Sequence, residues 1–346
     1  MTQDISEDDL IANLFAPIAG PGALGLKDDV ARFTPPAGCD LIVTKDALVA
    51  GVHFYADDPP DTIARKALRV NVSDVVAKGA DPLGFLLAAI LPDDVSLDWL
   101  QAFAQALGQD AARYQCPLLG GDTVRTPGPL TLSITALGSV PNGRMVARTG
   151  AQIGDAIYVS GSIGDAALGL YMRDDAPAWA AHLSLADRDF LRQRYLVPQP
   201  RFALRHVLRA HAHAAMDVSD GLVGDLSKMM RASATGARIE LARVPLSNAA
   251  RAAIALDDRL FETALTGGDD YEILCTIAPD QCAAFEAGAQ AVGVMVTRIG
   301  GVVAEGPTSF VDARGATRVF KRGSFSHFKS VNPAKAGIHD RQTLTR

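Results

Sequence analysis

The chain has 346 residues, 48% hydrophobic and 21% charged, which is typical of a folded protein long enough for two domains. Its formal net charge of −6 excludes the broad basic surface that binds nucleic acid or anionic membranes. The first residues lack the basic and apolar regions of a secretory signal, and no apolar run is long enough to span a membrane. The four cysteines show no CxxC spacing. We therefore expect a cytoplasmic protein with free thiols.

The first half of the chain is expected to alternate helices with strands. A capping box of Ser6 and Asp9 predicts a helix that ends near Gly20. The apolar run that begins at Asp40 predicts a strand that ends in a carboxylate. The helical periodicity of residues 61–80 predicts the helix that follows this strand.

Three more elements complete this half. The apolar run bounded by Pro82 and Pro92 predicts a buried strand. Ser96 is the expected cap of a helix over residues 96–114, and residues 131–146 are typical of a strand followed by a hairpin. The alternation predicts an α/β (α+β) fold in which mixed sheets pack against helices.

A second domain is expected to begin where glycines cluster around a strand, at residues 150–164. Strand and helix patterns alternate again through residues 214–292. We place the first domain at residues 1–148 and the second at 149–328. The polar, aperiodic residues 329–346 are expected to form a disordered tail.

The familiar nucleotide-binding patterns are missing or misplaced. Residues 20–25, "GPGALG", match GxGxxG, but they follow a helical pattern instead of a strand. The sequence contains no GxxxxGK[ST] motif and no protein-kinase HRD or DFG signature. A nucleotide would therefore have to be bound by another device.

Aspartates stand beside glycine, serine, threonine or a strand end in six segments, several of them otherwise apolar. They are Asp28 and Asp29, Asp46, Asp74, Asp122, Asp217 and Asp220, and Asp269 and Asp270. Any single one could be a helix cap or part of a turn. A carboxylate in an apolar setting nevertheless needs a cation or hydrogen-bond donors to offset its desolvation. Dispersed carboxylates without a Cys or His cluster favour magnesium, which binds a few carboxylates together with phosphates and water.

The chain carries, in order, the motifs DDVA, TKDALVAGVHF, KALRVNVSDVVAKGADP, LLGGDT, ARTGAQIGD, DVSDGL and GGDDYE. This set resembles the thiamine-monophosphate kinase family of the aminoimidazole-ribonucleotide-synthetase-like superfamily. The resemblance implies the two-domain fold of that superfamily and a homodimer paired through the first domains. It also implies that ATP phosphorylates thiamine monophosphate to thiamine diphosphate by direct in-line transfer, with several magnesium ions.

The resemblance also implies the residues of the site. The expected magnesium ligands are Asp29, Thr44, Asp46, Asp74, Asp122, Asp217 and Asp220. The expected ATP contacts are Tyr114, Gly121, Asp122, Arg148 and Ser219. The expected contacts of thiamine monophosphate are His53, Asp269 and Phe320, with Phe325 as the alternative aromatic residue. No dedicated general base is expected, because the acceptor phosphate is itself a nucleophile.

Three positions depart from the family pattern. Lys45 stands where a small hydroxyl residue is usual, Asp269 replaces a Glu, and Lys27 replaces a Gly. The Lys45 side chain could point away from the metals or bring its ammonium group to them, and the sequence leaves both open. No departure removes an expected metal ligand, so we expect tuned activity instead of lost activity.

Three other functions compete with this one. Another ATP-dependent enzyme of the superfamily is the nearest, but a selenophosphate synthetase would be expected to carry a reactive Cys or selenocysteine before Cys39. A magnesium-dependent phosphohydrolase would need a water-positioning group that the sequence does not single out. A non-catalytic sensor of thiamine phosphate or nucleotide would bind without turnover.

Overall fold

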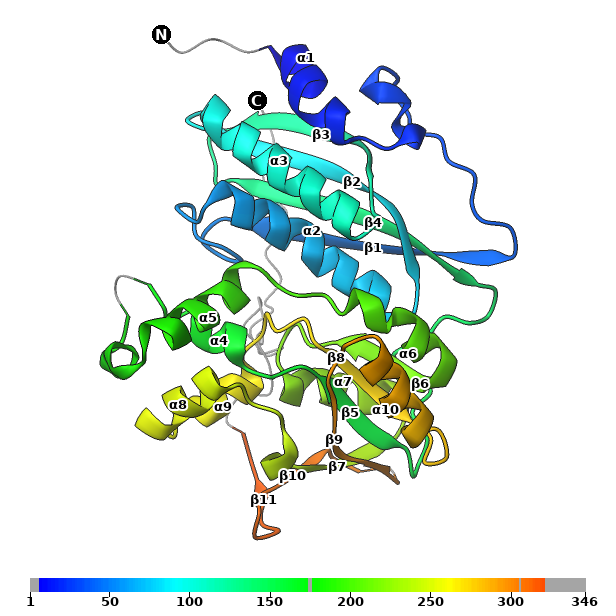
Figure 1. Ribbon diagram of the computed structural model, residues 1–346, viewed down its shortest axis with the longest axis vertical. Helices are drawn as coiled ribbons and strands as arrows, with labels where there is room; N and C mark the ends of the chain where they lie inside the picture. The colour runs from blue at the N-terminus through cyan, green and yellow to red at the C-terminus, as the bar shows by residue number, and fades with distance from the viewer. Residues whose placement is uncertain (1–5, 174–175, 305, 321–346) are drawn as a thin grey trace, which may run out of the picture.

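A computed structural model of the chain describes residues 6–173, 176–304 and 306–320. Its first half forms a four-stranded sheet (Figure 1). Across this sheet the strands are β1 (Cys39–Val49), β4 (Thr131–Pro141), β2 (Asp81–Pro92) and β3 (Leu118–Thr126). Only β2 and β3 run parallel to each other. The helices α2 (Pro60–Ala77) and α3 (Leu97–Arg113) cover one face (Figure 1). On the other face, which we call the open face, side chains such as Leu41 and Val43 of β1 are exposed in the part of the chain that the structure describes.

The second half forms a seven-stranded sheet with helices packed around it (Figure 1). Across this sheet the strands are β11 (Thr317–Arg318), β10 (Ser309–Val311), β7 (Gly236–Glu240), β9 (Val296–Val303), β5 (Ala156–Ser160), β8 (Ile273–Ile277) and β6 (Ala212–Asp217). The α-helices are α4 (Asp165–Gly169), α5 (Leu185–Leu196), α6 (Arg205–His211), α7 (Leu222–Ala232), α8 (Asn248–Leu256), α9 (Leu260–Thr266) and α10 (Cys282–Ala291). Short 3-10 turns lie at Ala178–His182, Phe202–Leu204 and Leu241–Arg243. The expected mixture of sheets and helices is confirmed.

The amino-terminal helix differs from its expectation. Ser6 caps it as predicted, because the Asp9 amide donates to Ser6 Oγ at 3.1 Å. However, only Glu7–Leu10 is α-helical (α1), and a π-helical turn and a 3-10 turn carry the chain on to Ile18. Pro17 lies in the 3-10 turn, and a proline has no amide hydrogen with which to continue an α-helix. The chain is thus helical as far as Ile18, close to the predicted end, but only its first turn is an α-helix.

The strand and helix predictions of the first half hold, with three changes. Strand β1 continues past Asp46 to Val49 instead of ending at the carboxylate, and a turn without a second strand, instead of a hairpin, follows β4. Ser96 caps α3 as expected, accepting a hydrogen bond from the Trp99 amide at 3.1 Å. Pro82 and Pro92 lie inside β2 instead of flanking it. "GPGALG" forms a 3-10 helix, Pro21–Leu26, and not the strand-to-helix turn of a dinucleotide site. The expected tail, residues 329–346, lies outside the described residues.

Helix α2 lies between the two halves of the molecule (Figure 1). Its Arg69 forms a bidentate ion pair with Asp110 of α3, with an Nε–Oδ2 distance of 2.5 Å and an Nη2–Oδ1 distance of 2.9 Å. Arg69 Nη1 also donates to the Pro198 carbonyl of the second half at 2.9 Å. Both charged side chains are at most 2% exposed, so each depends on the other for compensation. None of the described helices is both long and apolar enough to cross a membrane.

Replacing Asp110 by alanine is expected to lower the free energy of unfolding by about 3–5 kcal/mol, because it leaves the Arg69 guanidinium buried without its counter-ion. Urea unfolding of the full chain measures the change. Gln105→Ala, at an exposed position of the same helix, is the control and should change stability little. A loss below 1 kcal/mol for Asp110→Ala would show that the pair is not needed.

Candidate active site

Strand β1 and helix α2 bring three of the expected ligands together. Residues alternate between the faces of a strand, so Thr44 and Asp46 both face α2. Thr44 Oγ1 donates to Asp74 Oδ2 of α2 at 2.6 Å, and the Asp46 amide donates to Asn71 Oδ1 at 3.1 Å. The first half of the chain therefore presents two carboxylates and a hydroxyl on one side of α2.

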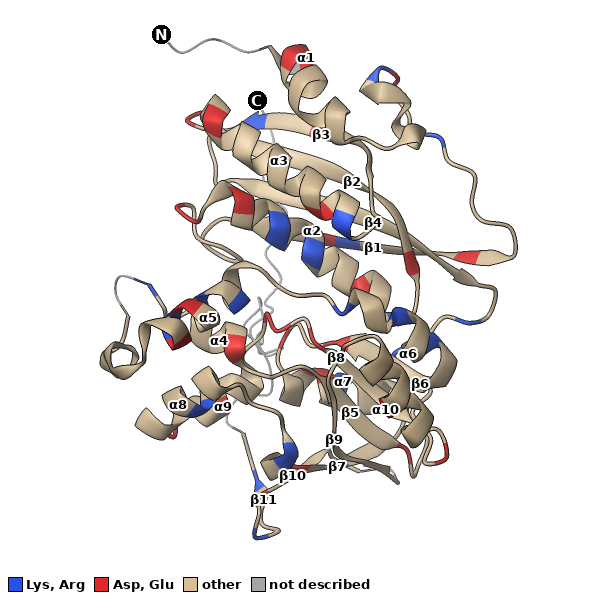
Figure 2. Cartoon of the chain, in the orientation of Figure 1, with Lys and Arg blue, Asp and Glu red and all other residues tan. Residues whose placement is uncertain are grey.

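The second half adds carboxylates at the end of β6. Asp217 is buried and accepts a hydrogen bond from Ser73 Oγ of α2 at 2.6 Å. Asp220 follows in the next turn, where it forms an ion pair with Lys228. Lys228 also pairs with Asp225, at 2.9 Å. Acidic segments of both halves thus lie where the two halves meet (Figure 2).

The pKa values of these carboxylates reflect first their burial and then one another's charge. Burial, followed by the charges of Asp74 and Asp220, raises the pKa of Asp46 to about 6. Burial, followed by the charge of Asp74, also raises the pKa of Asp217. Burial lowers the pKa of Lys78, which lies within the field of Asp217, Arg148 and Asp74. We call Asp46, Asp74, Asp217 and Asp220 the carboxylate cluster.

Carboxylate and hydroxyl oxygens suit magnesium, which prefers hard ligands and retains waters or phosphates beside a few protein groups. In the conformation described, no group of three or more His, Cys, Asp or Glu side chains within the described residues is arranged to hold a metal ion. The chemistry of the donors fits magnesium, but the protein groups do not by themselves form a complete coordination sphere.

Two expected ligands lie apart from the cluster. Asp122 is on β3, and three strand spacings, roughly 14 Å, separate β3 from β1 across the sheet. The register confirms this separation, because Asp46, Ile134, Leu87 and Gly121 lie in one row. Asp29 is exposed in the segment before β1. A single protomer therefore does not place Asp122 beside Asp46.

The expected ATP contacts are also spread over the molecule. Tyr114 is buried at the end of α3, with its ring edge-to-face to Phe202 at a centroid distance of 5.9 Å. Gly121 lies within β3, where an added Cβ would come 1.8 Å from the Leu87 carbonyl oxygen. Arg148 is exposed in the connection between the sheets, on the side of Lys78. Ser219 lies beside the cluster, and its backbone carbonyl oxygen accepts a hydrogen bond from the Asp269 amide at 2.8 Å.

The expected thiamine-side contacts divide into two groups. His53 Nδ1 accepts from the Val49 amide at 3.0 Å. Asp269 lies across the boundary between the halves from α2, where Lys66 Nζ approaches its Oδ2 to 2.9 Å. Phe320, which is half-buried, instead packs edge-to-face on Phe310 at a centroid distance of 5.2 Å, against the core of the second half. The alternative aromatic residue, Phe325, lies outside the described residues.

Lys45 points away from the cluster. It follows Thr44 on β1 and therefore faces the open side of the sheet, where its Nζ lies 3.4 Å from Thr135 Oγ1 of β4. The ammonium group does not replace metal charge in this conformation. Lys27, the third departure from the family pattern, is exposed.

Comparison with known proteins places this geometry in a family. The AIR synthase related protein N-terminal domain matches residues 27–140, and the corresponding C-terminal domain matches residues 152–312. A thiamine-monophosphate kinase from Caulobacter vibrioides is 44% identical over 337 residues, covering 96% of this chain and 90% of that protein. The chain belongs to the thiamine-monophosphate kinase family.

Solved structures of thiamine-monophosphate kinases share the fold. The enzyme from Stenotrophomonas maltophilia K279a is 41% identical, with a TM-score of 0.76 over 85% of this chain and 91% of that one. A structure of AaThiL complexed with AMPPCP and TMP is 28% identical, with a TM-score of 0.72 over 93% of this chain and 94% of that one. The two-domain fold of the superfamily is therefore confirmed.

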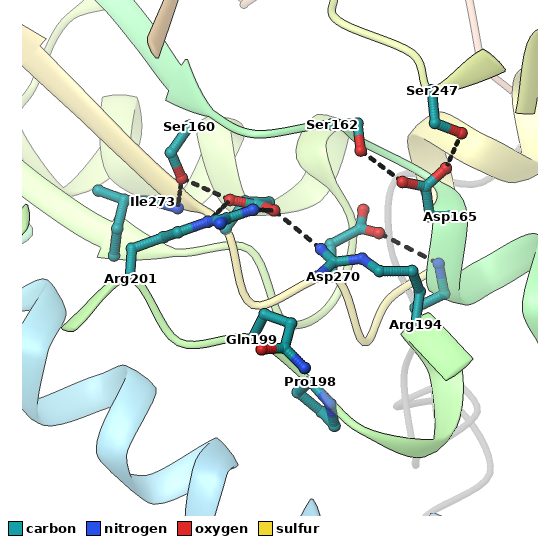
Figure 3. A network of polar contacts seen from close by, with 12 residues as sticks. Ser160, Ser162, Asp165, Arg194, Pro198, Gln199, Arg201, Ser247, Asp270 and Ile273 are labelled. Carbon is teal, nitrogen blue, oxygen red and sulfur yellow. Dashed lines mark hydrogen bonds and ion pairs between the residues drawn. The ribbon is translucent and has the colours of Figure 1, made fainter. Parts of the chain in front are cut away.

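The chain described here also contains a buried polar network that could not be inferred from its motifs (Figure 3). The Glu272 carboxylate, fully buried behind Asp269, accepts from Ser160 at 2.6 Å, Arg194 at 2.8 Å and Arg201 Nε at 2.5 Å. The adjacent Asp270 is buried too and accepts from the Gly164 amide at 2.8 Å. Together these bonds anchor the loop that presents Asp269.

Three residues at the boundary between the two halves, which we call the seam, were missed as well: Lys66 and Ser73 of α2, and Lys78, which directly follows this helix. The signal was present, since polar residues recur along a helix whose other positions are mostly apolar. A helix that is buried nearly all round needs partners for such residues. Here Ser73 bonds to Asp217, and Lys78 Nζ donates to the Ala215 carbonyl at 2.8 Å.

Replacing Asp46 by asparagine is expected to raise the melting temperature by about 2 °C at pH 8 in EDTA, because one repelling carboxylate is removed. Folding raises the pKa of Asp46 to about 6, so the ionised form is penalised above that pH and the penalty fades as the pH falls toward 4. The difference between the variant and the wild type should shrink over the same range. Asp94→Asn, at an exposed position, is the control. An equal or lower melting temperature for Asp46→Asn at pH 8 would contradict the repulsion.

Proposed function

We propose that the chain transfers the γ-phosphoryl group of ATP directly to the phosphate of thiamine monophosphate, with magnesium as the metal. The observation that carries the proposal is the meeting of carboxylates from both halves beside Asp269. It is supported by the Caulobacter vibrioides thiamine-monophosphate kinase at 44% identity and by the fold shared with AaThiL complexed with AMPPCP and TMP. The products are thiamine diphosphate and ADP.

The carboxylate cluster and Thr44 would hold magnesium ions at the seam. Bound magnesium neutralises phosphate oxygens, which is the main requirement when two anionic groups must approach each other. Asp122 and Gly121 would act at the nucleotide phosphates from the other edge of the sheet, and Asp29 would approach from the segment before β1. We assign Tyr114, Arg148 and Ser219 to the nucleotide.

The remaining residues orient the acceptor. His53 Nδ1 is engaged as an acceptor by the Val49 amide, which leaves the proton of a neutral ring on Nε2. Such a ring is suited to donate to the acceptor phosphate. Asp269 fixes the thiamine moiety, and Phe320 or Phe325 would pack against it. The acceptor phosphate attacks without a general base, so the protein acts by positioning and by charge.

The open face of the first sheet is proposed as the homodimer interface. It carries exposed apolar side chains on three of the four strands: Leu41 and Val43 on β1, Leu86 on β2 and Val124 on β3. Lys45 lies on the same face. Several exposed apolar side chains on one face of a sheet are typical of a protein contact. Four free cysteines, two of them buried, suit a reducing cytoplasm.

Asp217→Asn is expected to lower the turnover of ATP and thiamine monophosphate to thiamine diphosphate by about 100-fold or more, because a charge that would face the metals is lost. Product formation is followed with the full chain, ATP and magnesium, and circular dichroism checks that the variant is folded. Asp94→Asn is the control. Wild-type protein that binds thiamine monophosphate but forms no product would support the sensor and overturn the kinase.

Val43→Glu is expected to dissociate the homodimer, because it places a charge in the apolar face of the first sheet, where Val43 is 61% exposed. Sedimentation equilibrium measures the mass. Met295→Glu introduces the same charge at a position in the second half that is 76% exposed and outside this face. If both variants keep the wild-type mass, the open face is not the interface.

A further inference from the structure

Lys66 is a buried cation that the reaction described above does not use. Its side chain, on the first half's helix α2, is only 3% exposed. The ammonium nitrogen lies 2.9 Å from Asp269 Oδ2 and 3.8 Å from the centroid of the Tyr195 ring. Both partners belong to the second half. Lys66 therefore joins the two halves at the thiamine side of the site.

The Asp269 carboxylate is held at both oxygens. Lys66 approaches Oδ2, and the Tyr271 hydroxyl donates to Oδ1 at 3.3 Å. The backbone adds to this restraint, because Asp269 and Tyr271 have φ values of +70° and +50°. The left-handed conformation is uncommon for non-glycine residues; aspartate tolerates it better than most, whereas a bulky residue such as Tyr271 adopts it where the surroundings enforce it. The loop thus presents one carboxylate in one orientation.

A closely packed backbone explains why the loop keeps this shape. A Cβ at Gly268 would come 2.1 Å from the Ser219 carbonyl oxygen, so the two segments touch directly. The Asp269 and Tyr271 amides donate to the carbonyls of Ser219 and Val218, each at 2.8 Å. Backbone hydrogen bonds therefore join the segment between Asp217 and Asp220 directly to the segment that carries Asp269.

Tyr195 connects Lys66 with the other expected acceptor contact. Its ring lies under the Lys66 ammonium and edge-to-face with Tyr55 at a centroid distance of 6.5 Å. Its hydroxyl lies 3.5 Å from the His53 carbonyl oxygen. Lys66 thus touches Asp269 directly and approaches the His53 segment through a single aromatic ring.

The energetics argue against a purely packing role. An ammonium group buried beside a single carboxylate loses hydration that the pair only partly recovers, and an apolar residue of similar volume is often as stabilising. Lys66 and Tyr271 also place one donor against each oxygen of Asp269, which restricts the orientation of the carboxylate. A restricted carboxylate binds its ligand with less loss of conformational freedom.

We propose that Lys66, together with Tyr271, is a positioning residue for the acceptor. It orients Asp269 across the boundary between the halves. Through its contact with Tyr195, it also keeps Asp269 at a fixed position relative to His53. Its effect falls on binding of thiamine monophosphate and not on binding of ATP. This inference rests on the proposed function, because it takes Asp269 as the contact for that substrate.

The test begins with binding of thiamine monophosphate to the full chain, measured by calorimetry without ATP. Lys66→Met should raise the dissociation constant, and the KM for thiamine monophosphate, by about tenfold or more. The KM for ATP should change by less than about twofold. Equal increases for both substrates, or no increase for thiamine monophosphate, would overturn the proposal.

A double-mutant cycle tests whether Lys66 acts through Asp269. If it does, Lys66→Met combined with Asp269→Asn should weaken binding little more than Asp269→Asn alone. Full additivity of the two effects would overturn the proposal. Arg65→Met is the matched control, since it removes a cation from the neighbouring position of α2 that pairs with Asp110 and not with Asp269. It should leave thiamine monophosphate binding unchanged.

Tyr271→Phe keeps the inference testable if Lys66→Met does not fold. It removes the second donor to Asp269 with little change in volume, and should raise the same dissociation constant about threefold. An unchanged dissociation constant for thiamine monophosphate would overturn the proposal that Lys66 and Tyr271 position Asp269. Binding without thiamine diphosphate formation in the wild type would refute the kinase alone, because the variants are compared on binding.

Discussion

The repulsion between carboxylates at the seam of the molecule is the constraint on which the rest of the structure depends. Asp46 and Asp74 come from the first half, and Asp217 and Asp220 from the second. Like charges at short range in a partly dry site would separate the halves unless other contacts held them together. Helix α2 and the residue that follows it supply those contacts, because Arg69, Ser73 and Lys78 each bond to the second half. The helix therefore carries both an acid of the cluster and the bonds that offset the repulsion.

Separate hydrophobic clusters in the two halves explain how the repulsion at the boundary between them is tolerated. One core packs α2 and α3 on the first sheet, and separate clusters pack the helices of the second half on its sheet. Each half thus has its own apolar support, and the polar residues gather where the halves touch. A site at such a boundary is positioned by rigid elements from both sides, whereas its charges remain accessible to a ligand.

Much of this could be predicted from the sequence, because helix and strand periods are local. The direction of Lys45 was also within reach, since strand alternation that turns Thr44 and Asp46 toward α2 turns Lys45 the other way. Strand order was not, because it depends on pairing between distant segments. Motif matching therefore grouped Asp122 with Asp46, whereas β3 and β1 are opposite edges of the sheet. The break at Pro17 needed only the rule on prolines, and strong helical periodicity concealed it.

The two Gly-Gly-Asp segments show why identical letters need separate structural accounts. In "LLGGDT" the glycines lie within an edge strand, and Gly121 touches the backbone of β2. In "TGGDDYE" Gly268 touches the backbone at Ser219, and the aspartate that follows has a positive φ. Gly121 and Gly268 each allow one backbone to approach another, so neither segment is an ordinary turn. What distinguishes the aspartates is their partners: Asp269 is held by Lys66 and Tyr271, whereas Asp122 is exposed on β3. Asp269 is therefore suited to contact a ligand in one fixed orientation, and Asp122 to contact a ligand that brings its own metal.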